Sequence, residues 1–246
     1  MLKNAIMGNE VTRAGRILGL FFLLSFTSFP LQGQETGEDK LGAWYMYFGM
    51  NRVSERLSVH TEAQFRFYET LSEFNQLLLR TGLNYHINEE AIATLGYAYI
   101  DTDPTYGDTA DLLNDIKEHR IFQQFILMNQ VGKFKFEHRY RLEQRFLDSE
   151  GEKDTRHRAR YRLQVTLPVS KSFFLNFYDE IFLNLQDEIF DQNRLYAALG
   201  FKFSDKGNIQ VGYLKNHFSR TNFDRLQLAF FYNPDLRSLF NREIPD

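Results

Sequence analysis

Apolar and polar side chains alternate along most of the chain that follows residue 40. In residues 56–68, Leu57 and Phe65 belong to an apolar set of alternate positions, while Glu62 and Arg66 belong to the polar set between them. A period of two is typical of a β-strand whose two faces meet different surroundings, whereas a helix would mix the two sets on each face. The pattern therefore predicts a strand with one apolar and one charged face.

The same alternation recurs along the chain and predicts an all-β protein. It is equally clear in residues 133–146 and 156–167. Weaker copies bring the candidate strands to eleven, and they occupy residues 44–50, 76–86, 91–101, 118–130, 173–183, 194–203, 209–216 and 223–232. In residues 118–130 both faces carry apolar side chains, so the pattern leaves the register of this segment open.

The links between these segments alternate in length. The short links are residues 51–55, 87–90, 132, 168–171 and 204–208, and the longer links are residues 102–117, 147–155, 184–193 and 217–222. Short turns at one rim and longer loops at the other are typical of an antiparallel up-and-down transmembrane β-barrel. Single-chain bacterial barrels have an even number of strands, so eleven segments imply one strand missed or one wrongly split. We therefore expect 10 to 12 strands.

The first part of the chain has the features of a secretory signal peptide. Lys3, Arg13 and Arg16 precede an apolar run over residues 17–29 that is too short to span a bilayer as a helix. The chain contains no cysteine, which excludes a disulfide framework, a lipid-modified cysteine and thiolate metal sites. The predicted organisation is a signal peptide over residues 1–33, a polar linker over 34–40, the barrel over 41–233 and a C-terminal tail over 234–246.

Alternation alone does not say which face points into the barrel. A soluble barrel hides its apolar face inside, whereas a membrane barrel exposes that face to lipid. An eleven-strand barrel is hard to fill with side chains alone, and segments of about ten residues suit strands that cross a bilayer at a tilt. The sequence therefore favours the cell outer membrane, with lipid as a partner. A soluble periplasmic ligand-binding barrel is the alternative if the faces are inverted.

The aromatic content supports the membrane interpretation. Aromatic residues make up 16% of the chain, with 25 Phe and 13 Tyr. Such side chains form girdles at the two membrane interfaces of a transmembrane barrel. We expect this position for six residues towards strand ends: Trp44, Tyr47, Tyr97, Tyr99, Tyr213 and Tyr232.

Six segments carry a resemblance to a known family. They are NQLLLRTGLNY (residues 75–85), LGYAYI (95–100), EHRIFQQF (118–125), EHRYRLEQRF (137–146), RARYRLQ (158–164) and DQNRLYAALGF (191–201). Together they resemble the bacterial domain-of-unknown-function family 2490. The family is treated as outer-membrane β-barrel proteins without an established activity, so the resemblance implies a fold and a location but no catalytic residue.

If the apolar faces meet lipid, the polar faces line the lumen with a charge network. The predicted lumen-facing residues are Glu62, Arg66, Arg80, Glu118, Arg120, Glu137, Arg139, Arg141, Glu143, Arg145, Arg156, Arg158, Arg160, Arg162, Glu180, Arg194 and Arg225. Residues 137–145 and 156–162 form a hairpin, so their side chains are cross-strand neighbours that can build bidentate carboxylate–guanidinium pairs.

This arginine excess leaves two functions open. A lumen closed by ion pairs predicts a structural or interaction barrel of the cell envelope, because buried charges persist when they are paired. A basic constriction predicts passive permeation or binding of small anionic solutes, as rings of Arg and Lys produce in anion-selective pores.

Other classes of function receive little support. A net charge of −3 does not favour a nucleic-acid partner, and the sequence contains neither G-x-S-x-G nor H-E-x-x-H. His217 beside Ser219 is the best candidate for a lipid-modifying enzyme site, and His60 with Glu62 for a metal site. The acidic residues of segment 101–115 do not have the spacing of a calcium loop. We therefore expect no enzymatic activity, no metal and no cofactor.

Overall fold

A computed structural model describes residues 37–107 and 115–240 as eleven strands with two short helical segments. The predicted signal peptide lies outside the described residues. A short 3-10 turn, η1 (Gly37–Asp39), precedes the first strand, and α2 (Arg237–Phe240) follows the last. The strands are β1 (Gly42–Arg52), β2 (Leu57–Phe67), β3 (Phe74–His86), β4 (Ala91–Thr102), β5 (Ile116–Val131), β6 (Phe134–Ser149), β7 (Glu152–Pro168), β8 (Phe173–Asn184), β9 (Phe190–Ser204), β10 (Gly207–His217) and β11 (Asn222–Tyr232). No helix in these two ranges is long and apolar enough to cross a membrane.

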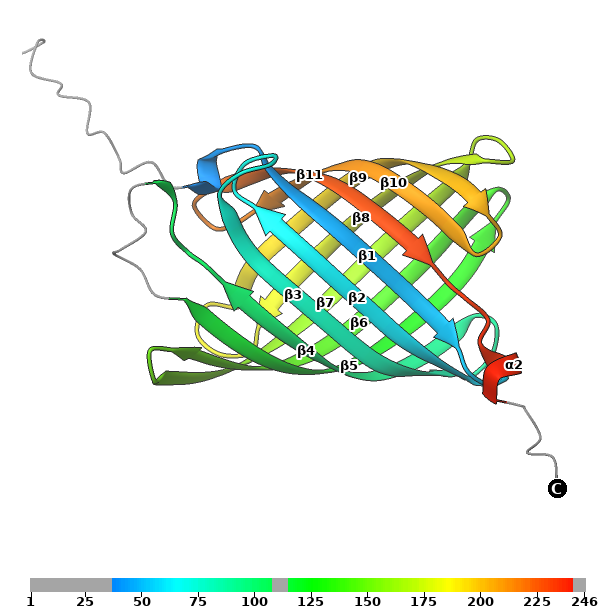
Figure 1. Ribbon diagram of the computed structural model, residues 1–246, viewed down its shortest axis with the longest axis horizontal. Helices are drawn as coiled ribbons and strands as arrows, with labels where there is room; N and C mark the ends of the chain where they lie inside the picture. The colour runs from blue at the N-terminus through cyan, green and yellow to red at the C-terminus, as the bar shows by residue number, and fades with distance from the viewer. Residues whose placement is uncertain (1–36, 108–114, 241–246) are drawn as a thin grey trace, which may run out of the picture. The chain divides into compact units, whose positions relative to one another are not determined.

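The strands form one closed barrel in chain order (Figure 1). Each strand pairs antiparallel with the next, and β1 closes the barrel by pairing parallel with β11. The predicted all-β barrel of 10 to 12 strands is confirmed. The expectation of an even number was wrong, because a parallel seam lets an odd number of strands close.

The parallel seam gives the barrel two different rims. The loop rim carries the start of β1, the links 68–73, 150–151, 185–189 and 218–221, and the two ends of the β4–β5 link. The turn rim carries the end of β11 and the links 53–56, 87–90, 132–133, 169–172 and 205–206. As a result η1 and α2 lie at opposite ends of the barrel (Figure 1).

One of the predicted long loops does not exist. Residues 147–155 are mostly strand, because β6 and β7 continue to a tight turn at Glu150 and Gly151. Both turn residues have positive φ angles, 51° for Glu150 and 88° for Gly151. The polar composition of this segment reflects a hairpin exposed beyond the rim, since polar strand residues on both faces look like a loop in the sequence.

The apolar faces point outward and the charged faces point inward. In β5, whose register the sequence left open, Ile121 is 43% exposed on the outside and Phe122 is 1% exposed on the inside. Tyr97, Tyr213 and Tyr232 are exposed on the outer surface. Trp44 is a correction to the predicted girdle, because it points into the barrel and is only 7% exposed.

Inward-facing glycines allow aromatic rings to lie flat on the inner wall. A Cβ atom at Gly96 would stand 2.2 Å from the ring of Phe122, and one at Gly212 would stand 2.5 Å from the ring of Tyr196. Any larger residue at either position would displace the ring. These pairs let large apolar side chains occupy a lumen that alternation predicts to be polar.

Candidate functional site

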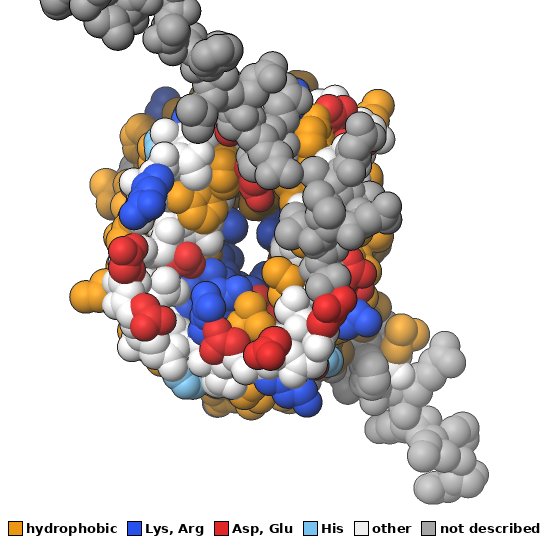
Figure 2. Space-filling model, turned by 90° about the vertical axis from the view of Figure 1, so that its left-hand side faces the viewer, with side chains coloured by type: hydrophobic (Ala, Val, Ile, Leu, Met, Phe, Trp, Pro, Cys, Tyr) orange, Lys and Arg blue, Asp and Glu red, His pale blue; other side chains and the backbone are white. Residues whose placement is uncertain are grey.

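The lumen encloses a cavity of about 620 Å³. Ten arginines and two lysines line it against four glutamates. Figure 2 looks onto the loop rim and shows Lys and Arg side chains around a hollow in this face. The wall of the cavity is therefore strongly basic.

Glu143 is the hub of an ion-pair network on the inner face of β5 to β8. Its side chain is fully buried and accepts hydrogen bonds from Arg158 at 2.7 and 2.9 Å and from Arg160 at 2.7 Å. Arg120 and Arg141 lie 3.4 and 3.7 Å from the same carboxylate. One negative charge thus faces four guanidinium groups.

Two further carboxylates extend this network. Glu180 accepts hydrogen bonds from Arg160 at 2.8 and 3.0 Å and from Arg139 at 2.7 Å. Glu118 accepts a bidentate pair from Arg145, both bonds at 2.9 Å, and a bond from Arg120 at 2.7 Å. Bidentate guanidinium–carboxylate pairs are strong and geometrically specific, so they hold these side chains in fixed positions.

The predicted pairing across the β6–β7 hairpin is only partly right. Glu143 lies opposite Arg158, but Arg141 lies opposite Arg160 and Arg139 lies opposite Arg162. Like charges directly opposite each other are unfavourable. Carboxylates from the strands on either side compensate for this repulsion, because Glu118 comes from β5 and Glu180 from β8.

A smaller cluster occupies the inner face of β2 and β3. Arg80 donates to both oxygens of Glu62 at 2.5 and 2.6 Å. Gln64 donates to Glu62 at 2.5 Å, and the ring of His60 lies 3.0 Å from the same carboxylate. Both oxygens of the Glu62 carboxylate therefore have hydrogen-bond partners within the protein.

Two buried phenylalanines support the guanidinium groups, and neither is among the residues predicted to form the lumen site. Arg160 lies 4.1 Å and Arg194 4.6 Å from the ring centre of Phe182, and Arg141 lies 4.9 Å from that of Phe122. Cation–π contacts stabilise an arginine where carboxylates are scarce. The signal in the sequence is an aromatic residue on the charged side of the alternation.

Arg66 and Arg194 differ from the rest of the network. Within the described residues neither has a carboxylate within ion-pair distance. Arg66 donates to Gln64 and Gln76, and no hydrogen bond to a described residue forms at Arg194. Both contact the ring of Trp44, with Cζ atoms 3.9 and 5.0 Å from its centre. This corner of the lumen carries two positive charges without a matching acid.

The remaining four predicted network residues lie towards the barrel ends. Arg162 pairs with Glu137 at 2.5 Å inside the cavity. Arg156 does not join the network, because it lies on the protruding β6–β7 hairpin and pairs with Asp154 while its side chain is 57% exposed.

Arg225 pairs with η1 at the loop rim. It donates to the Glu38 carboxylate at 2.9 Å and to the Lys40 carbonyl at 2.9 Å. Burial raises the pKa of Glu38 from its ordinary value, although the charge of Arg225 opposes this shift. Arg225 therefore attaches the segment before β1 to the barrel.

The candidate enzyme and metal residues do not form an assembled site. The ring of His217 hydrogen-bonds to Asn222 at 2.6 Å, and no bond to Ser219 is present. No cluster of three metal-ligating side chains occurs in residues 37–107 and 115–240. Segment 101–115 is described only in part, since residues 108–114 lie outside the described residues.

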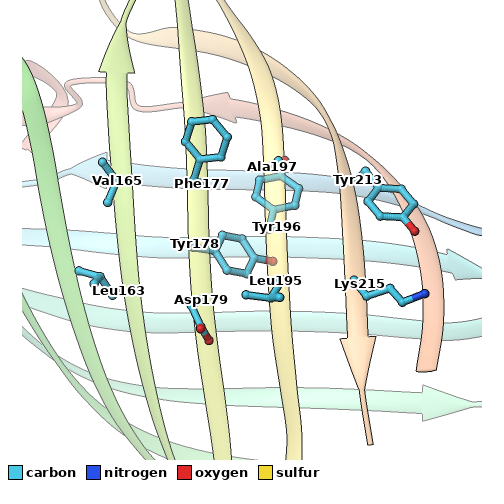
Figure 3. Close-up of a pocket in the computed structure, with 10 residues that line it drawn as sticks. All are labelled: Leu163, Val165, Phe177, Tyr178, Asp179, Leu195, Tyr196, Ala197, Tyr213 and Lys215. Atoms are coloured by element: carbon cyan, nitrogen blue, oxygen red, sulfur yellow. The ribbon is translucent and has the colours of Figure 1, made fainter. Parts of the chain in front are cut away.

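A second hollow of about 450 Å³ lies on the outer wall of β7 to β10 (Figure 3). Its lining is mostly apolar, with Phe177, Leu195 and Tyr213 among its residues. Asp179 and Lys215 are its charged residues. Asp179 accepts a hydrogen bond from Asn193, which explains how a carboxylate is held on an otherwise apolar face.

Fold and lumen together define a closed β-barrel with a basic, ion-paired interior and an apolar outer surface. The chain belongs to the family described as "Protein of unknown function (DUF2490)", which matches residues 41–227. It is similar to an uncharacterized protein of Methylorubrum extorquens, with 28% identity over 179 residues that cover 68% of this chain and 74% of that protein. No solved structure matches the chain. The predicted resemblance to this family is confirmed.

Proposed function

We propose that this protein is an outer-membrane barrel whose lumen binds small anionic solutes and lets them pass. The observation that carries the proposal is the lining of the cavity, where twelve basic side chains face four glutamates. Rings of Arg and Lys select anions in pores of this kind.

The outer surface supports a location in lipid. Large apolar side chains cover the outside of the strands, far beyond what a soluble monomer exposes. They include Phe65, Leu79, Leu83, Leu95, Ile121, Phe125, Leu142, Phe177, Leu195, Leu199, Val211 and Leu228. The charged interior also counts against the inverted alternative, a soluble barrel with an apolar interior.

Polar side chains on the outer surface pair with one another. Gln123 and Gln144 exchange hydrogen bonds at 3.0 and 3.2 Å, and His138 bonds to the Tyr161 hydroxyl at 2.9 Å. Lipid offers no hydrogen-bond partners, so a polar group that faces it is costly unless it is paired. Such pairing is what a lipid-facing surface requires.

The lumen retains hydrogen-bonding capacity for a solute. Among the described residues, the buried Nε atoms of Arg80, Arg139, Arg162 and Arg194 have no hydrogen-bond partner within the chain. Each also lines the cavity. A buried donor needs a partner, and an anion with its hydration water supplies one.

The first test measures ion selectivity of the purified full-length chain in planar bilayers, after a gel-mobility shift between unboiled and boiled samples has established a folded barrel. We expect conductance with a reversal potential that favours anions in a salt gradient. Lys135→Glu with Lys202→Glu reverses two charges that line the cavity towards the turn rim. This double variant is expected to lower the anion preference severalfold.

Lys171→Glu is the matched control, because Lys171 is exposed in the turn-rim link 169–172 and does not line the cavity. Equal effects of Lys171→Glu and the double variant would contradict selection by the lumen. A folded barrel in the outer membrane with no conductance and no anion binding would instead support the closed structural barrel.

A further inference from the structure

The inner wall of the barrel contains two regions of different chemistry. The network around Glu143 and Glu180 lies on β5 to β8, whereas an apolar cluster lies on the inner face of β1, β9, β10 and β11, beside inward polar side chains such as Gln210 and Gln227. This apolar wall consists of Trp44, Met46, Tyr196, Ala198, Leu214 and Ala229, with Phe48, Tyr178 and Phe231 packed against it. A lumen that served inorganic ions alone would have no need of such a wall.

The apolar wall borders the same cavity as the arginines. Met46, Tyr196 and Phe231 line the cavity together with the basic side chains. The aromatic rings of the apolar wall stack in pairs. The ring centres of Tyr178 and Tyr196 lie 4.6 Å apart, and those of Phe48 and Phe231 lie 4.8 Å apart. A solute in the cavity therefore meets aromatic surface on one side and guanidinium groups on the other.

Arg66 on β2 and Arg194 on β9, which have no carboxylate within ion-pair distance among the described residues, lie next to the apolar wall. Trp44 belongs to the apolar wall and contacts both Arg66 and Arg194. A guanidinium group binds a carboxylate through two parallel hydrogen bonds. The volume of about 620 Å³ falls within the roughly 300–1,000 Å³ of pockets for small organic ligands.

We propose that the lumen is selective for small organic carboxylates with an apolar body, whose head binds Arg66 and Arg194 and whose body lies on the apolar wall next to Trp44. This inference rests on the proposed function and narrows its substrate class. The hydrophobic effect adds to binding only for a solute with an apolar body, so a bare carboxylate gains less.

Trp44 provides the measurement, because it is the single tryptophan of the chain. We would titrate the folded full-length protein in a nonionic detergent with cyclohexanecarboxylate and follow Trp44 fluorescence. Acetate supplies the head without the body, and cyclohexylmethanol supplies the body without the charge. We expect saturable binding of cyclohexanecarboxylate and at least roughly tenfold weaker responses to the other two probes.

Variants test the two parts of the proposed site separately, the arginines that bind the carboxylate and the wall that binds the apolar body. Arg194→Gln removes one of the two charges that bind the carboxylate and is expected to weaken the binding of cyclohexanecarboxylate roughly tenfold or more. Met46→Ser removes the part of the wall beside Trp44 and is expected to weaken the binding of cyclohexanecarboxylate while acetate conductance stays the same. Arg156→Gln, on the exposed hairpin, is the matched control and should bind normally.

The outcomes distinguish this inference from the proposed function. Equal affinities for acetate and cyclohexanecarboxylate, with anion conductance intact, would overturn the inference and leave the anion pathway standing. Absence of a saturable fluorescence change with conductance intact would do the same. Loss of both binding and conductance would overturn both proposals.

Discussion

A few carboxylates neutralise the arginines of the lumen, and Glu143 carries the largest share. Its carboxylate faces Arg120, Arg141, Arg158 and Arg160. A buried ion pair contributes little net stability relative to an apolar replacement, but removal of one partner leaves an uncompensated buried charge. The loss of one residue can therefore cost more than its pairwise contacts suggest.

Replacement of Glu143 by Gln is expected to destabilise the barrel by about 3–5 kcal/mol, because four guanidinium groups lose their shared counter-charge. Urea unfolding of the purified chain in detergent, followed by the gel-mobility shift, would measure the free energy of unfolding. Glu89→Gln is the control, since Glu89 is exposed in the turn 87–90. A Glu143→Gln barrel as stable as the Glu89→Gln barrel would show that the network is not neutralised through this residue.

Among the elements, residues 234–237 after β11 are attached to the end of β1 by a short set of contacts at the turn rim. The Arg52 amide donates to the Pro234 carbonyl at 3.0 Å, and the Leu236 amide donates to the Arg52 carbonyl at 2.8 Å. The Asp235 carboxylate accepts bonds from the backbone amide and the guanidinium of Arg237. We refer to these residues, Arg52 with 234–237, as the C-terminal clasp.

The C-terminal clasp should weaken in acid. Hydrogen bonds from Arg237 lower the pKa of Asp235 from its ordinary 3.8 to about 2. A lowered pKa in the folded state means that the ionised form stabilises the clasp fully above the ordinary value and that this contribution disappears as the pH falls towards 2. Hydrogen exchange of the Leu236 and Arg237 amides, corrected for intrinsic rates, would show falling protection over this range.

Asp235→Asn should remove this pH dependence and lower the protection severalfold at pH values above the ordinary carboxyl pKa. Asp205→Asn is the control, because Asp205 is exposed in the link 205–206 at the same rim. Identical pH profiles for the native chain and Asp235→Asn would exclude this carboxylate as the acid-sensitive group.

The sequence predicts those features of the strands that depend on local alternation, but not those that depend on contacts with neighbouring strands. Alternation located all eleven strands and placed Glu62 and Arg80 on the inner face, because period and parity are local properties. It missed Trp44 as an inner residue and the apolar wall as a whole, since the space for an inward ring depends on neighbouring strands, as at Gly212, whose missing side chain leaves room for the ring of Tyr196. It also ended strands too early around residues 147–155, where exposure makes both faces polar.

For the whole molecule, the number of strands determines where the ends of the barrel lie. With eleven strands and a parallel seam, Leu41 precedes β1 at the loop rim and Ser238 lies in α2 at the turn rim. The eleven segments found from the alternation already implied this arrangement, but the even number of strands usual in single-chain bacterial barrels argued against it. In a bilayer the two rims face different compartments.

Single-cysteine labelling would test this arrangement, and the absence of native cysteine makes each label unique. In intact cells we expect an impermeant maleimide to label only one of Leu41→Cys and Ser238→Cys, and lysis to expose the other. Glu188→Cys marks the loop rim and should match Leu41→Cys, whereas Glu89→Cys marks the turn rim and should match Ser238→Cys. Labelling of Leu41→Cys and Ser238→Cys from the same side would exclude a barrel closed by a parallel seam.

The parallel seam also limits how the chain could be rearranged. The strand that separates the two ends, β1, has 11 residues, which at roughly 3.3 Å per residue amounts to about 36 Å. A circular permutant would therefore need a bridge of on the order of ten residues or more, where two suffice between β9 and β10. In the proposed lipid environment, the backbone of an extended bridge outside the wall would find no hydrogen-bond partners, so the bridge would have to run through the lumen. Joining the two ends would thus place a segment of chain in the cavity of the lumen.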